Sequence, residues 1–275
     1  MNNKERDDYI NKQVKRHYEE FKKAYPDKEL FALCLQGSQN YDLDMYTDEY
    51  KSDIDTKAIV IPSFEEIVLN KKPISTTHIL SNNEHIDIKD IRLMFDNFKK
   101  QNINFLEILF TDFGIFNKKY EDEWNYLLKN RELIAHYNTN QALRCMAGMS
   151  MEKKKALTHP YPTLKDKIEK YGYDGKQLHH IIRMYNFITA YALNVSFKEC
   201  LTFFIPGQKE EMMKAKLNQY SLEEAIKMAE HYDFFTKYIK DISLKEKDEI
   251  NQEALEVLNK IQYDVIKKKL KEEVI

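Results

Sequence analysis

Glycine and proline are scarce in this chain of 275 residues, which contains 6 of each. Both residue types interrupt regular structure, so the composition leaves little room for flexible linkers. Cysteine is scarce as well: Cys34, Cys145 and Cys200 are far apart and form no CxxC pair. This spacing argues against a disulfide framework or a cysteine-based zinc site and favours buried free thiols.

The chain also lacks a long apolar run and a clear excess of either charge. No segment approaches the roughly 20 apolar residues of a membrane-spanning helix, and the first residues, MNNKERDDYINKQ, lack the apolar core of a signal peptide. With 43 basic and 45 acidic residues, the net charge of −2 does not indicate nucleic-acid binding. We therefore expect a cytoplasmic globular protein without a membrane partner.

The spacing of apolar residues predicts a mixed first part of the chain. A helical stripe runs over residues 4–25 and ends at Pro26. Short apolar or alternating runs predict strands over residues 30–35, 54–61, 76–80 and 85–88.

Beyond about Glu121 the pattern becomes helical throughout. Helices are predicted over residues 121–131, 138–158, 174–195, 209–217, 221–241 and 249–272. We therefore expect an α+β protein, with a small mixed β-sheet core in residues 1–120 and an all-helical domain in residues 121–275.

Two carboxylates mark the start of the second predicted strand, at Asp53 and Asp55. Side chains two residues apart in a strand point to the same face, and two neighbouring carboxylates repel unless a cation lies between them. A hard, oxygen-ligated ion such as Mg²⁺ or Mn²⁺ would relieve the repulsion. The sequence thus predicts a metal site, whereas a solvated acidic strand start is the plainer interpretation.

Two further features strengthen the prediction of a metal site. Gly37 and Ser38, at the end of the preceding strand, offer close backbone approach and a hydroxyl, which suits a phosphate held by amide N–H groups. Asp87 lies between apolar residues of a later strand. If that strand neighbours the Asp53 strand, three carboxylates converge and could hold two metal ions for phosphoryl transfer. Asp90 is close enough to leave the choice of the third carboxylate open.

These residues resemble the motifs of the DNA polymerase beta superfamily, and within it the RNA-ligase-associated, polymerase beta-like nucleotidyltransferases. The resemblance rests on four blocks: Gly37-Ser38-x-x-Tyr41, Ser52-Asp53-x-Asp55, Asn104-Phe105-Leu106-Glu107-Ile108-Leu109, and Tyr171-Gly172-Tyr173-Asp174-x-Lys176-x-x-His179-x-x-x-Arg183. The blocks span roughly residues 33–195. The chain departs from the family pattern at Asp42, where a glycine is usual, and its loop between Ser38 and Ser52 is a few residues longer.

The resemblance implies an enzyme that transfers a nucleoside monophosphate from a nucleoside triphosphate, such as ATP, to an acceptor hydroxyl. It implies catalytic metal ligands at Asp53, Asp55 and Asp87, with Asp87 also helping to deprotonate the acceptor. It also implies nucleotide contacts from Gly37, Ser38, Ser52, Lys176, His179 and Arg183. The helical domain would close the nucleotide cleft, and the family name implies an RNA end as acceptor.

A basic helix carries the last of these contacts. Offsets of three, four and seven residues place Lys176, Arg183 and at least one of His179 and His180 on one face. A solvated face with one histidine in the core explains the pattern equally well. For the run at residues 153–155, a solvated charged face is the interpretation we favour.

Two other functions are compatible with the same motifs. One is a toxin-like or defence transferase that modifies protein or transfer RNA or makes a signalling nucleotide, because fold does not choose among these activities. The other is a non-catalytic nucleotide-binding module, which is less favoured because all three candidate carboxylates are present.

Overall fold

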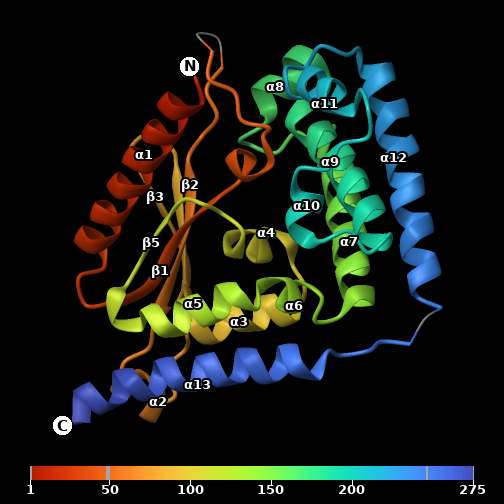
Figure 1. The fold of residues 1–275 in the computed structure, drawn as a ribbon. Coiled ribbons are helices and arrows are strands. Elements are labelled where there is room, and N and C mark those ends of the chain that lie inside the picture. The colour runs from red at the N-terminus through yellow and green to blue at the C-terminus, as the bar shows by residue number, and fades with distance from the viewer. Residues whose placement is uncertain (1, 48–49, 246, 275) are drawn as a thin grey trace. The chain divides into compact units, whose positions relative to one another are not determined.

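The computed structural model describes residues 2–47, 50–245 and 247–274 (Figure 1). The chain divides into two compact units, one formed by residues 1–137 with 250–275 and the other by residues 138–249. The sequence-based boundary lay after residue 120. The observed division differs because residues 121–137 and the last helix pack with the sheet-bearing unit.

Five strands form one mixed sheet in the first unit, in the order β3-β4-β2-β1-β5. Their bounds are β1 Glu29–Gln36, β2 Asp55–Ile61, β3 Ser75–Ile79, β4 His85–Asp90 and β5 Gly114–Phe116. The central strand β2 is antiparallel to β1 and parallel to β4, and β3 and β5 pair antiparallel with their neighbours. Gln36 pairs with Asp55, so the end of β1 lies beside the start of β2.

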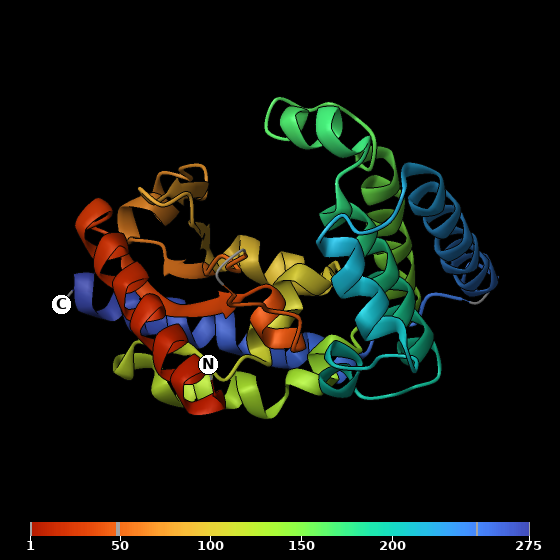
Figure 2. The same cartoon turned by 90° about the horizontal axis from the view of Figure 1, so that it is seen from above.

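Helix α1 (Asn3–Ala24) covers one face of this sheet (Figures 1 and 2). Its first turn is closed by a capping box, in which Asn2 and Glu5 exchange side-chain to backbone hydrogen bonds of 2.9 Å. Its buried apolar residues are Ile10, Val14 and Phe21. They share a core with residues of the sheet and its approach, among them Leu33, Leu35, Ile54, Ala58, Val60, Ile86 and Ile88. Burial of each large apolar side chain contributes roughly 1.5–3 kcal/mol.

The remaining helices of the first unit form a separate layer. They are α2 Phe64–Val68, α3 Ile91–Lys99, α4 Ile103–Leu106, α5 Glu121–Lys129, α6 Arg131–Ala135 and α13 Gln252–Val274, with 3₁₀ turns η1 Ser38–Tyr41, η2 Glu107–Leu109 and η3 Lys118–Tyr120. α13 contacts α3, α5, α6 and β2. Its buried residues include Ala254, Leu258, Ile261 and Val265, which recur at helical spacing.

The described residues of the second unit form helices and connecting loops, without a strand. Its helices are α7 Thr139–Ala156, α8 Lys165–Tyr171, α9 Gly175–Ala192, α10 Phe197–Leu201, α11 Gln208–Lys216 and α12 Leu222–Ser243. α9 contacts α7, α10, α11 and α12, and α7, α9 and α12 run side by side (Figure 2). A Cβ added to Gly175 would lie only 1.9 Å from the carbonyl oxygen of Ala215, so α9 requires glycine at its start.

The prediction of an α+β fold, with a mixed sheet followed by a mostly helical part, is confirmed. All four predicted strands are present, and within the described residues no strand lies beyond Phe116. The three-residue strand β5 and the short helices α2, α4, α6, α8 and α10 were not predicted from the sequence. No helix among the described residues is both long enough and apolar enough to cross a membrane.

Candidate functional site

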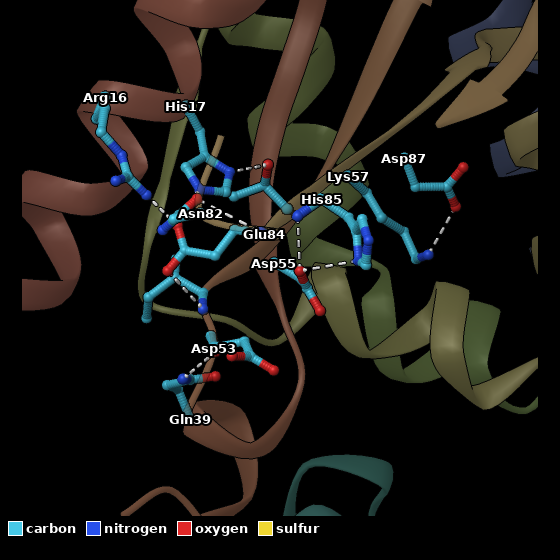
Figure 3. Close-up of polar contacts among 12 residues, drawn as sticks. Arg16, His17, Gln39, Asp53, Asp55, Lys57, Asn82, Glu84, His85 and Asp87 are labelled. Atoms are coloured by element: carbon cyan, nitrogen blue, oxygen red, sulfur yellow. Dashed lines mark hydrogen bonds and ion pairs between the residues drawn. The ribbon is translucent and has the colours of Figure 1, made fainter. Parts of the chain in front are cut away.

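Asp55 is the first residue of β2 and Asp53 lies two residues before it, both on the same side as Lys57 (Figure 3). Asp53 is exposed to solvent, and the Asp55 side chain retains 31% exposure. The backbone N–H of His85 donates to Asp55 Oδ1 at 2.8 Å, and the His85 Nδ1 lies 3.5 Å from the same oxygen. Both aspartates therefore present carboxylate oxygens to solvent from a rigid strand start.

The Gly37–Ser38 turn lies directly beside these aspartates. Gly37 has φ +107°, a conformation that other residues rarely adopt, and it precedes the 3₁₀ turn η1. The side-chain amide of Gln39 donates to the carbonyl oxygen of Asp53 at 2.8 Å and to the Tyr46 hydroxyl at 3.1 Å. Gln39 thus ties the turn to the Asp53 backbone.

Contacts within the loop and with α1 hold parts of the described residues between Ser38 and Ser52. Arg6 forms two hydrogen bonds of 2.7 and 2.8 Å with the Asp44 carboxylate, and the Ser52 hydroxyl accepts from the Met45 N–H at 2.9 Å. Asp42 has φ +55°, in the left-handed region that favours glycine, which gives the family's usual glycine a physical reason. Ser52, predicted to contact nucleotide, is buried and holds the loop.

Strand β4 lies beside β2, as the sequence analysis expected, and its register places Asp87 opposite Lys57. Lys57 Nζ lies 2.9 Å from Asp87 Oδ2, and Lys89 Nζ lies 3.2 Å from Asp87 Oδ1. Asp90 points elsewhere: it caps α3 and pairs with Arg92 at 2.7 Å. Asp87 is therefore the carboxylate beside the Asp53–Asp55 strand, but both its oxygens are engaged by ammonium groups.

Lys57 is an unusual neighbour for these carboxylates, because its side chain is only 6% exposed. Its ammonium group lies 4.3 Å from the centre of the Phe105 ring, and that of Lys89 lies 5.4 Å from the same ring. Burial lowers the pKa of Lys57, and it outweighs the opposing effect of the negative charges of Asp87 and Asp55.

A second polar group lies on the other face of β2, between the sheet and α1 (Figure 3). Glu84 accepts from the N–H of Ile54 at 3.2 Å and pairs with Arg16, and its Oε2 lies 3.0 Å from His17 Nε2. His17 is fully buried, and its Nδ1 lies 3.0 Å from Thr56 Oγ1. Burial raises the pKa of Glu84, but hydrogen bonds from His17 and its other partners outweigh burial and lower it. Glu84 therefore anchors the backbone between the two aspartates from behind.

Residues 104–109, singled out by the resemblance, reach the site from two directions. Phe105 covers Lys57 and Lys89, and the buried Glu107 accepts from the Gly37 N–H at 3.2 Å. No role is predicted from the sequence for Glu107, Glu84 or Lys57. Lys57 could have been found from the sequence, because it lies two residues after Asp55 and therefore on the same face of the strand.

The donor set fits one divalent cation better than two. Asp53 and Asp55 supply exposed carboxylate oxygens on one strand face, and Mg²⁺ is commonly held by one or two carboxylates together with water and substrate phosphates. Within the described residues, no group of three or more His, Cys, Asp or Glu side chains could hold a metal ion. The expected convergence of Asp87 on a shared metal site is therefore not observed, because Lys57 and Lys89 engage its carboxylate.

The predicted basic residues of the second unit lie on α9, and they face two ways. His179 is buried and its Nδ1 lies 3.1 Å from the Met212 carbonyl oxygen. Burial, together with the nearby charges of Lys216 and Arg183, lowers the pKa of His179 to about 3. His179 therefore belongs to the contact between α9 and α11 rather than to a solvent-facing stripe.

His180 lies four and three residues from Lys176 and Arg183, and His179 lies three and four residues from them, so helical spacing alone does not separate the two histidines. Burial, with the charges of Arg183 and Lys153, lowers the pKa of His180 well below its ordinary value. Burial and the charge of Arg183 likewise lower the pKa of Lys153 on α7. Lys153, which was predicted to lie on a solvated face, thus forms a group of three cations with Lys176 and Arg183. Such a cluster favours an anion.

Comparison of the chain with protein-family profiles and with curated proteins finds no match.

Proposed function

We propose that this chain is a divalent-metal-dependent nucleotidyltransferase. It would transfer a nucleoside monophosphate from a nucleoside triphosphate to an acceptor hydroxyl and release pyrophosphate. The observation that carries the proposal is the pair Asp53 and Asp55, which project together at the start of β2 beside the Gly37–Ser38 turn. A metal ion there would balance the two carboxylates and bind the phosphates that the turn approaches.

The turn supplies the second element of the proposal. Gly37, with its positive φ, leads from the end of β1 into the 3₁₀ turn η1, and Ser38 adds a hydroxyl, while the Gly37 N–H itself donates to Glu107. Amide groups in such turns are suited to phosphate oxygens. In the other unit, Lys176 and Arg183 are proposed to bind phosphate through point charge and forked donors, with Lys153 beside them.

The finer fold assignment, a polymerase beta-like core, belongs to the same proposal. It is supported by the order of α1, β1, the Gly37–Ser38 turn and β2, and by the parallel strand β4 beside β2. An RNA end as acceptor is what the resemblance to the RNA-ligase-associated family implies. The toxin-like transferase and the non-catalytic module remain alternatives that one experiment separates.

The test is incubation of the chain with each labelled nucleoside triphosphate, Mg²⁺ or Mn²⁺, and total cellular RNA. Asp53→Asn removes one metal ligand and keeps the side-chain shape. Asp8→Asn, on the exposed side of α1, is the matched control. Label entering RNA with wild type and Asp8→Asn, but not with Asp53→Asn, would support the proposal and name the nucleotide.

Two other outcomes favour the alternatives. Label entering protein or a small product, again lost in Asp53→Asn, would indicate the toxin-like or signalling activity. Absence of transfer, together with Mn²⁺-dependent binding of nucleotide in calorimetry, would indicate a binding module. Absence of both transfer and metal-dependent binding would refute the proposed metal site.

A further inference from the structure

The surroundings of Asp87 differ from those expected of a metal ligand. Each of its two carboxylate oxygens is paired with a different ammonium group, Oδ2 with Lys57 at 2.9 Å and Oδ1 with Lys89 at 3.2 Å. The three side chains come from adjacent parallel strands in register, so strand geometry fixes the pairing. Asp87 thus already has two positive partners supplied by the chain.

The two lysines are held in place from outside the sheet. The Phe105 ring lies 4.3 Å from the Lys57 ammonium and 5.4 Å from that of Lys89. The side chains of Lys57 and Lys89 are 6% and 14% exposed, so neither group can swing freely into solvent. An aromatic face stabilises cations at such distances, which makes the arrangement a built feature of the sheet.

A divalent ion bound to Asp87 would have to displace one lysine or lie next to both. Two ammonium groups within hydrogen-bond distance of its only carboxylate would repel it. Asp53 is exposed and the Asp55 side chain retains 31% exposure, so both present carboxylate oxygens to solvent. The carboxylate of Asp87, by comparison, is already neutralised by two lysines of the sheet.

We propose that the ammonium group of Lys57 takes the place of a second metal ion, so that this chain binds one divalent ion, at Asp53 and Asp55. The inference rests on the proposed function, and it departs from the two-ion site that the resemblance implies. Lys57 would be a fixed cation on the same strand face as the metal ligands (Figure 3).

The test counts bound Mn²⁺ ions in the full chain, using electron paramagnetic resonance and calorimetry. Each measurement is made with Mn²⁺ alone and with Mn²⁺ plus the α,β-methylene analogue of ATP. The variants are Asp87→Asn, Lys57→Met and the conservative Lys57→Arg, each checked for folding by circular dichroism. This readout does not depend on turnover.

We expect wild type, Asp87→Asn and Lys57→Arg to bind one Mn²⁺ ion, and Lys57→Met to bind a second ion because Asp87 loses its nearest cation. If Lys57→Met does not fold, the pair of wild type and Asp87→Asn still decides the question. Two ions in wild type, with one lost in Asp87→Asn, would overturn the inference and leave the proposed function intact. No Mn²⁺ binding in wild type under either condition would overturn both.

Discussion

The two faces of β2 carry polar groups of opposite character. Toward α1, Glu84 and the fully buried His17 form a closed network with Thr56 and with the backbone of Ile54. On the other face, Asp53 and Asp55 reach solvent with carboxylate oxygens. The polar groups on one face of β2 therefore find their hydrogen-bond partners within the fold, whereas the carboxylates on the other face are suited to binding a ligand.

The difference indicates how the site is positioned. A buried charge persists only when its partners compensate the loss of hydration, and Glu84 has three kinds of partner. Because one of them is the N–H of Ile54, the buried network fixes the backbone from which the two exposed aspartates project. The back face is then expected to determine stability, and the front face activity.

The largest expected effect is on the front face. Asp55→Asn keeps an acceptor for the His85 N–H but halves the negative charge available to a metal ion. Transferase activity should fall on the order of 10³-fold, by analogy with the loss of other transition-state charge stabilisers. Thermal unfolding should change little, because the side chain is partly exposed. If Asp55→Asn also lowered the thermal unfolding temperature strongly, the proposed division of roles between the two faces would be wrong.

The next effect is on the back face. Glu84→Gln removes the negative charge that pairs with Arg16. It also replaces one accepting oxygen by an NH₂ group, which cannot accept hydrogen bonds from the groups that now donate to Glu84. We expect a loss of about 1–3 kcal/mol in the free energy of unfolding, measured by urea denaturation. Glu65→Gln is the control, since its 2.6 Å pair with Lys71 is exposed and should be worth less than about 1 kcal/mol. Equal effects of the two variants would contradict the assignment.

Much of the sheet could be predicted from sequence, because β1 and β2 are short runs of buried residues and β4 alternates regularly. β5 could not, since Gly114–Phe116 is a three-residue edge strand without a period. The place of α13 was also inaccessible. Its stripe predicts a helix but does not say which unit it covers.

The site was predictable only where local geometry suffices. Alternation in a strand places Asp53 and Asp55 together, whereas the Lys57–Asp87 pair depends on the register of two strands joined through β3. On α9, helical spacing groups Lys176 with Arg183, but it does not say which histidine faces the core. Contacts with α11 decide that it is His179.

Helix α9 also has a buried side, where His179 contacts α11, and this side is expected to affect stability in a pH-dependent way. The pKa of His179 is lowered to about 3 in the folded chain, against roughly 6.5 for an unperturbed histidine. Between these values the unfolded chain takes up a proton that the folded chain does not, so stability falls as pH falls below about 6.5. His179→Gln should remove a contribution of up to about 1.4 kcal/mol per pH unit in that window.

Urea denaturation at pH 8, 6.5 and 5.5 measures this change. The variant has a fixed cost from lost contacts, which appears at pH 8, where the ring is neutral in both states. The free energy of unfolding should then decline less steeply for His179→Gln than for wild type as pH falls. Identical slopes would mean that His179 takes up a proton in the folded state, contrary to its buried contact with Met212.

The smallest effect concerns the loop that leads to the front face. Asp42 adopts φ +55°, and its N–H donates to the Ser38 carbonyl. Asp42→Gly should stay within about 0.5 kcal/mol of wild type, because relief of the left-handed conformation offsets the greater freedom of glycine in the unfolded chain. Asp42→Ala gains no such relief and should be less stable by about 1 kcal/mol. Transfer activity retained in Asp42→Gly would show that this position contributes its backbone conformation to the site, whereas activity lost at unchanged stability would assign a role to the carboxylate.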